Sequence, residues 1–106
     1  MTTINTQPLV TLINVHTCKS EDQQRLTDLL MEGVKTIYRH APGFISANIH
    51  KSLDGVRVTN YAQYRSREDV ESAWSHPAIP AFAQEVGRLV TSFDAHLYEV
   101  VEVFHT

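Results

Sequence analysis

Two asparagines and a tyrosine stand in segments that otherwise read as apolar strands. Asn14 follows V-T-L-I, and Asn60 and Tyr64 lie in V-T-N-Y-A-Q-Y. An amide buried without a partner costs about 1–3 kcal/mol, so each needs a structural hydrogen bond or a ligand. In the structural alternative, the two amides bond the neighbouring backbone and the phenol of Tyr64 caps a core edge. Three polar groups converging in an apolar cavity would form a small-molecule site, in which amide donors stabilise developing negative charge on oxygen.

Three further side chains are candidate substrate contacts, namely Trp74, Phe82 and His50. Trp74 stands before a helix break, where its ring could line a pocket mouth or belong to the core. His50 reaches the face of Asn60 only if a bulge alters the strand pairing. The six histidines show no HxH or HExxH spacing, so no metal site is expected. No phosphate-binding glycine loop and no serine with placed partners is present, which excludes nucleotide and nucleophilic chemistry of those kinds.

The composition describes one ordinary globular domain. The chain has 106 residues, 42% hydrophobic and 20% charged, with a net charge of −3. A mild acidic excess argues against nucleic-acid binding, which needs a basic stripe. No apolar run is long enough to span a membrane, no signal peptide is recognisable, and the single cysteine, Cys18, cannot form an internal disulfide. We therefore expect a cytoplasmic protein.

The elements that must position these side chains follow from spacing and turn residues. We expect a flexible terminus over residues 1–7 and a single domain over 8–106, with strands at 9–15, 44–53, 56–65 and 95–104. A helix should begin at Ser20, with Gln23 in capping-box spacing, and run to Tyr38. A short helix should cover 66–74 and a second helical segment 79–93. This βαββαβ order predicts an α+β, ferredoxin-like fold with a four-stranded antiparallel sheet.

Strand pairing places the polar residues. If Asp54 and Gly55 form a two-residue turn, the expected pairs are Leu53 with Val56, Ile49 with Asn60, Ala47 with Ala62 and Ile45 with Tyr64. Asn60 and Tyr64 then project onto the helix-covered face, as does Asn14 with Val10 and Leu12. The opposite face would carry Thr11, Ile13, Val15, Tyr61 and aliphatic side chains of the last strand. That face is too apolar to remain wet, so we expect a homodimer formed through the sheet.

With this order in hand, the sequence resembles the antibiotic biosynthesis monooxygenase family of dimeric α/β barrels. The likeness covers about residues 8–104 and is carried by V-T-L-I-N, by Pro-Gly-Phe before the second strand, and by N-Y-A-Q-Y-R-S-R-E-D-V-E-S-A-W at 60–74. The resemblance implies that Asn14 and Asn60 hold substrate oxygens and that Tyr64 occupies a tryptophan position of the family. Val70 and Gln84 stand near the places of a tyrosine and an arginine in some relatives.

What the resemblance implies is a monooxygenase that needs no cofactor. Its substrate would be a small aromatic or phenolic compound, similar to an anthrone, and the co-substrate dioxygen. Asn14, Asn60 and Tyr64 would be its catalytic residues. One alternative is the haem-degrading branch of the same fold, although Phe82 and Ala83 stand where its iron-binding histidine is expected. Another is a non-catalytic dimer that binds a small ligand or responds to stress.

Overall fold

The expected βαββαβ order is confirmed by the computed structural model, which describes residues 9–106. The expectation for residues 1–7 lies outside this range. The elements, with η for short 3-10 helices, are β1 (Val10–Cys18), η1 (Ser20–Asp22), α1 (Gln23–Thr36), η2 (Tyr38–His40), β2 (Phe44–Lys51), β3 (Arg57–Tyr64), α2 (Arg67–Trp74), α3 (Ile79–Gly87) and β4 (Val90–Tyr98).

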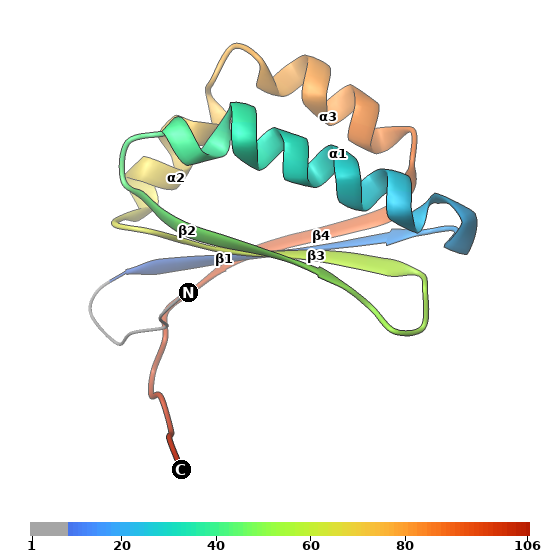
Figure 1. The fold of residues 1–106 in the computed structure, drawn as a ribbon. Coiled ribbons are helices and arrows are strands. Elements are labelled where there is room, and N and C mark those ends of the chain that lie inside the picture. The colour runs from blue at the N-terminus through green and yellow to red at the C-terminus, as the bar shows by residue number, and fades with distance from the viewer. Residues whose placement is uncertain (1–8) are drawn as a thin grey trace.

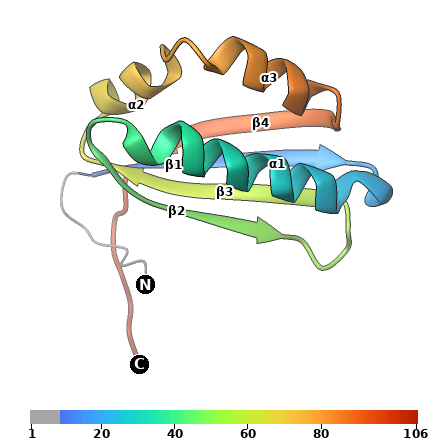
Figure 2. The same cartoon turned by 45° about the horizontal axis from the view of Figure 1, so that its top comes forward.

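The domain has two layers. The three α-helices of residues 9–106 lie on one face of a four-stranded antiparallel sheet with strand order β2-β3-β1-β4, and no helix of these residues covers the other face (Figures 1 and 2). The C-terminal segment after β4 leaves the domain on the uncovered side (Figure 1). This is the ferredoxin-like arrangement, in which apolar stripes of the helices cover a single sheet face.

The predicted pairing of β2 with β3 holds over most of its length. Ile49 faces Asn60 and Ala47 faces Ala62, as expected. A register shift between Phe44 and Ser46 then places Phe44, and not Ile45, opposite Tyr64. The expected pairing of Ile45 with Tyr64 is therefore wrong, because one extra residue in β2 displaces everything before it.

The end of the chain differs more from expectation. α3 ends at Gly87 and β4 begins at Val90, whereas a helical segment to 93 and a strand over 95–104 were expected. Val90 pairs with Cys18 and Phe93 with His16, and the register shifts between these two pairs. A bulge therefore places two residues three positions apart on the same strand face, which imitates helical spacing.

The two predicted helix starts have different outcomes. The hydroxyl of Ser66 accepts a hydrogen bond from Asp69 N at 3.1 Å, which is the predicted cap of α2. At the other start, Ser20 begins the 3-10 turn η1 and α1 begins only at Gln23, and neither start has a side-chain cap. Gln23 instead donates to the carbonyls of Ser52 and Arg57, each at 3.0 Å, and so ties the start of α1 to the β2–β3 hairpin.

The core of the described residues divides into two clusters on the covered face of the sheet. One lies toward α2 and contains Leu12, Ala62, Tyr64, Val70 and Ala73. The other lies toward the start of α1 and the end of α3 and contains Cys18, Leu26, Leu30, Val58 and Val86. On both β1 and β3, the asparagine stands between residues of the first cluster and residues of the second. The sheet is therefore polar at the level where the two clusters meet.

Candidate active site

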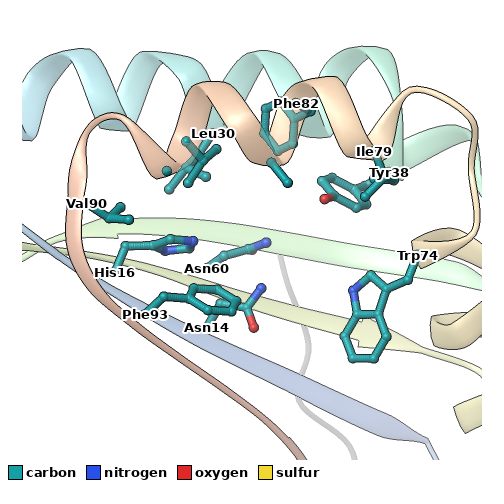
Figure 3. Close-up of a pocket in the computed structure, with 13 residues that line it drawn as sticks. Asn14, His16, Leu30, Tyr38, Asn60, Trp74, Ile79, Phe82, Val90 and Phe93 are labelled. Carbon is teal, nitrogen blue, oxygen red and sulfur yellow. The ribbon is translucent and has the colours of Figure 1, made fainter.

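A cavity of about 310 Å³ lies between the sheet and the helices at this polar level (Figure 3). This volume is at the lower end of the range of about 300–1,000 Å³ for small-molecule sites. Every strand and helix except β2 and η1 contributes to its wall. The lining residues are Asn14, His16, Leu30, Tyr38, Asn60, Trp74, Ile79, Phe82, Ala83, Val86, Gly87, Val90 and Phe93.

Asn14 and Asn60 face each other across the β1–β3 ladder and both line the cavity. The two oxygens, Oδ1 of each side chain, are buried and have no hydrogen-bond partner among the described residues. An unpaired buried acceptor costs about 1–3 kcal/mol, so two on one cavity wall form a polar pair that a ligand could satisfy. Each amide also offers an NH₂ donor, which lets the pair bind a carbonyl, a hydroxyl or a phenolate oxygen.

His16 stands one step further along the same face of β1, opposite Val58. It is 3% exposed, and its Nδ1 lies 3.1 Å from the carbonyl oxygen of Val58. The Phe93 ring packs against the imidazole with 5.2 Å between ring centroids. Burial lowers the pKa of His16, and the hydrogen bond to Val58 opposes that shift without cancelling it. The ring is therefore neutral near pH 7.

The wall toward the helices is aromatic. Phe82 of α3 and Tyr38 of η2 pack edge to face, with ring centroids 6.0 Å apart and planes at 74°. Trp74 also lines the cavity and remains 43% exposed, which places its indole at the rim (Figure 3). Flat aromatic faces and two amides suit a planar polar aromatic ligand.

Of the six predicted site residues, the structure brings Asn14, Asn60, Trp74 and Phe82 into one cavity. His50 is not a substrate contact of this cavity, because the bulge that would bring it to the face of Asn60 is not present at its position. His50 pairs with Thr59, one residue out of phase with the Ile49–Asn60 pair, so its side chain points to the uncovered face and is exposed. The register shift in β2 lies before residue 46, too far along the strand to turn His50 inward.

Tyr64 lies beside the cavity and not on its wall. It is 2% exposed in the first core cluster, and its ring packs against Phe44 with centroids 5.7 Å apart. Burial, together with the nearby Tyr38 phenol, raises the pKa of Tyr64 to about 12. Its hydroxyl therefore stays protonated at neutral pH, and any influence on a ligand would pass through Tyr38.

We accordingly expect Tyr64→Phe to lower kcat/KM for a substrate bound in this cavity by less than tenfold, because the phenol does not line the cavity. Since the pKa of Tyr64 is about 12, the pH–rate profile should show the same alkaline limb in the variant and the wild type. Steady-state kinetics at several pH values would measure both. A loss of more than a hundredfold would instead place the hydroxyl at the reacting atoms.

Two polar residues of the wall, His16 and Tyr38, are not among the site residues predicted from the sequence. The expected first strand stops at residue 15, but β1 continues to Cys18. The alternation that places Asn14 on the covered face also places residue 16 there, so the signal was available. Tyr38 was assigned to the helix stripe, and only the 3-10 turn after α1 directs it to the cavity.

Gly33 sets the position of the Phe82 ring. A Cβ at residue 33 would lie 2.7 Å from Cε1 and 3.1 Å from Cε2 of Phe82, so the ring would have to move. We expect Gly33→Ala to turn Phe82 into the cavity and to raise the KM for an aromatic substrate about tenfold. Its thermal midpoint should stay the same or fall, since the helix gain of about 1 kcal/mol offsets only part of an overpacking cost of about 1–3 kcal/mol. Kinetics and thermal melting would test this, with Glu32→Ala on the exposed side of α1 as control. An unchanged KM would contradict it.

No Asp, Glu, Lys or Arg is among the described residues that line the cavity. Within residues 9–106, no group of three or more His, Cys, Asp or Glu side chains could hold a metal ion. The same range contains no helix that is long and apolar enough to cross a bilayer. The polar chemistry of the cavity therefore rests on two amides, one imidazole, one phenol and one indole.

Comparison with known proteins gives a consistent result. The family model described as antibiotic biosynthesis monooxygenase matches residues 9–85. Tetracenomycin-F1 monooxygenase from Streptomyces glaucescens is 42% identical over 80 residues, which cover 74% of this chain and 71% of that protein. The segment that the family model matches includes both asparagines, His16 and Trp74.

Solved structures agree on the fold. SnoaB, a cofactor-independent oxygenase from Streptomyces nogalater, superposes with a TM-score of 0.82 at 14% identity, over 92% of this chain and 97% of that one. A monooxygenase from Streptomyces coelicolor, solved in complex with nanaomycin D, has a TM-score of 0.79 at 24% identity, over 93% and 92% of the two chains.

Proposed function

Because this chain belongs to the antibiotic biosynthesis monooxygenase family, we propose that it is a cofactor-independent oxygenase that converts an anthrone-like phenol to a quinone. The relative at 42% identity acts, by its name, on tetracenomycin F1, and the fold is shared with an oxygenase described as cofactor-independent. The substrate is a planar aromatic molecule that carries a carbonyl or hydroxyl at one edge and an activated ring carbon.

The observation that carries this proposal is the pair of facing amides with unpaired oxygens in an apolar cavity. A ring ketone flanked by hydroxyls complements the pair, because the amide NH₂ groups donate to the ketone and the Oδ1 atoms accept from the hydroxyls. As the ring carbon loses its proton, negative charge moves to the ketone oxygen. Donors already aimed at that oxygen in a dry site stabilise the charge, typically by about 3 kcal/mol for one well-placed group.

The proposed reaction balances without a cofactor. The activated CH₂ carbon loses a proton, and the resulting enolate gives one electron to dioxygen. The substrate radical and superoxide join to form a carbon-bound peroxide, which takes up a proton. Cleavage of the O–O bond with loss of the second hydrogen leaves a new carbonyl and releases water. One oxygen atom of dioxygen enters the quinone and the other enters water.

We also propose that the protein is a homodimer formed through the uncovered sheet face. Ile13, Val15 and Tyr61 point to that face and are only half-buried in the single chain. The side chains that β4 adds there are Asp94, His96 and Tyr98, not the aliphatic ones expected. The apolar contribution instead comes after β4, where Val101 and Phe104 are 83% and 88% exposed on the same side of the domain (Figure 1).

Oxygen uptake with dithranol tests the function. The purified protein, with no flavin, metal or haem added, should accelerate oxygen consumption and form the corresponding quinone. Anthrone without ring hydroxyls should react with a higher KM, since it cannot satisfy the amide oxygens.

A haem titration tests the main alternative function. A saturable Soret shift with no dithranol oxidation would favour the haem-degrading function. Ligand binding without oxygen uptake would favour a non-catalytic dimer.

A further inference from the structure

We propose that His16 is the base of this site and that its Nε2 removes the proton from the activated ring carbon of the substrate. This proposal rests on the proposed oxygenase function and names the proton acceptor that the reaction requires. Apart from His16, the described wall consists of amide, aromatic and aliphatic residues. These are poor bases or cannot accept a proton at all, so His16 is the candidate that the wall offers.

The hydrogen bond at Nδ1 determines the tautomer of His16. A carbonyl oxygen can only accept, so the contact of 3.1 Å with Val58 requires the hydrogen to be on Nδ1. In the neutral ring the lone pair is then on Nε2, the nitrogen that can take up a proton. The backbone of β3 holds the ring in one orientation, and Phe93 packs against it. A base held in this way needs no reorganisation before the reaction.

The sheet register places the imidazole at a suitable distance from the amides. His16 and Asn14 are two residues apart on one strand and share a face, so their Cα atoms are separated by about 6.5–7 Å. Figure 3 shows the ring of His16 turned toward the amide of Asn60. In an anthrone the carbonyl oxygen and the reactive methylene lie at opposite sides of the central ring. A substrate whose carbonyl is bound between Asn14 and Asn60 can therefore direct its methylene toward Nε2.

The surroundings keep this base neutral. Tyr38 is the other titratable side chain on the described cavity wall, and no charged group faces the imidazole there. Cys18 follows on β1 and is buried in the second core cluster, where burial raises its thiol pKa. The lowered pKa of His16 keeps Nε2 unprotonated at neutral pH. After it takes the carbon-bound proton, the imidazolium returns it to the peroxide oxygen, and the catalyst is restored before the O–O bond breaks.

His16→Gln is the direct test, because glutamine can still donate to the Val58 carbonyl but cannot accept a proton. We expect kcat for dithranol to fall about 100-fold or more, the usual contribution of a general base. The dissociation constant of the quinone product should change less than threefold. The acid limb of the wild-type kcat profile, expected below about pH 6.5, should disappear. Added imidazole should restore activity to His16→Ala in proportion to its unprotonated form.

His40→Gln is the matched control, since the His40 ring also bonds a backbone carbonyl at 3.1 Å but is exposed and outside this cavity. It should keep wild-type kinetics. A folded His16→Gln with wild-type kcat and an unchanged acid limb would overturn the base assignment and leave the oxygenase function standing. The base assignment would also be overturned if His16→Gln loses both quinone binding and kcat while the acid limb of the profile is retained. Failure of the wild type to accelerate dithranol oxidation would instead refute the proposed function itself.

Discussion

Replacing Asn60 by alanine should lower kcat/KM for an anthrone about 100-fold or more, while the free energy of unfolding stays the same or rises. Loss of one preorganised donor to a developing oxyanion costs roughly 100- to 1,000-fold in rate. The same amide contributes nothing comparable to stability, because its oxygen is buried without a partner among the described residues. Removing the unpaired oxygen raises the free energy of unfolding by about 1–3 kcal/mol, and the loss of packing contacts offsets part of this gain.

Opposite effects on activity and stability distinguish a ligand-binding amide from a structural one. Denaturant unfolding and dithranol kinetics on the same preparation would measure both. Asn14→Ala should have the same effects on activity and stability, since the two amides form one cross-strand pair. The fold-loss of kcat/KM in the double variant should be smaller than the product of the two single-variant losses. If Asn60→Ala loses stability by 2 kcal/mol or more and retains its rate, the amide serves the fold and the site assignment fails.

Replacing Ile13 by aspartate should convert the proposed dimer to a monomer. Ile13 lies on β1, a central strand, and pairs with Tyr61 and His96 on the uncovered face. A carboxylate at this central position must be desolvated when the dimer forms, which costs several kcal/mol. The neighbouring His96 does not offset this cost, because its Nε2 already lies 2.7 Å from Oδ1 of Asp94. About 3 kcal/mol corresponds to a dissociation constant raised about 100-fold. Sedimentation at micromolar concentration would then show the mass of a single chain.

Met31→Asp is the control for this experiment. Met31 is 37% exposed on α1, a helix that lies on the other side of the sheet. It introduces the same charge away from the proposed interface and should leave the dimer intact. A wild-type protein that sediments as a single chain at these concentrations would contradict the dimer, as would an Ile13→Asp variant that keeps the wild-type mass.

Local patterns were sufficient to predict the element order and the central register. The Asp54-Gly55 turn places Asn60 opposite Ile49, and alternation along β1 places Asn14 on the same face. These two facts locate the amide pair. That both side-chain oxygens lack a partner among the described residues is visible only in the structure.

Features that depend on tertiary contacts were not predictable in the same way. The bulge near Ile45 shifts the partner of Tyr64, and the bulge between Val90 and Phe93 imitates a helix. The direction of Tyr38 depends on how α1 ends, and the tautomer of His16 depends on a carbonyl contributed by β3. Residues in the site were therefore easier to predict where strand alternation alone decides their side, as for the asparagines.

Oxidation of dithranol under isotopically labelled dioxygen tests the central claim most directly. The protein alone, without added flavin, metal or haem, should form the quinone faster than the uncatalysed reaction, with one labelled oxygen atom in the new carbonyl. Asn60→Ala and His16→Gln should reduce that labelled product in proportion to their loss of rate. A purified, folded protein that produces labelled quinone no faster than buffer alone would contradict the account.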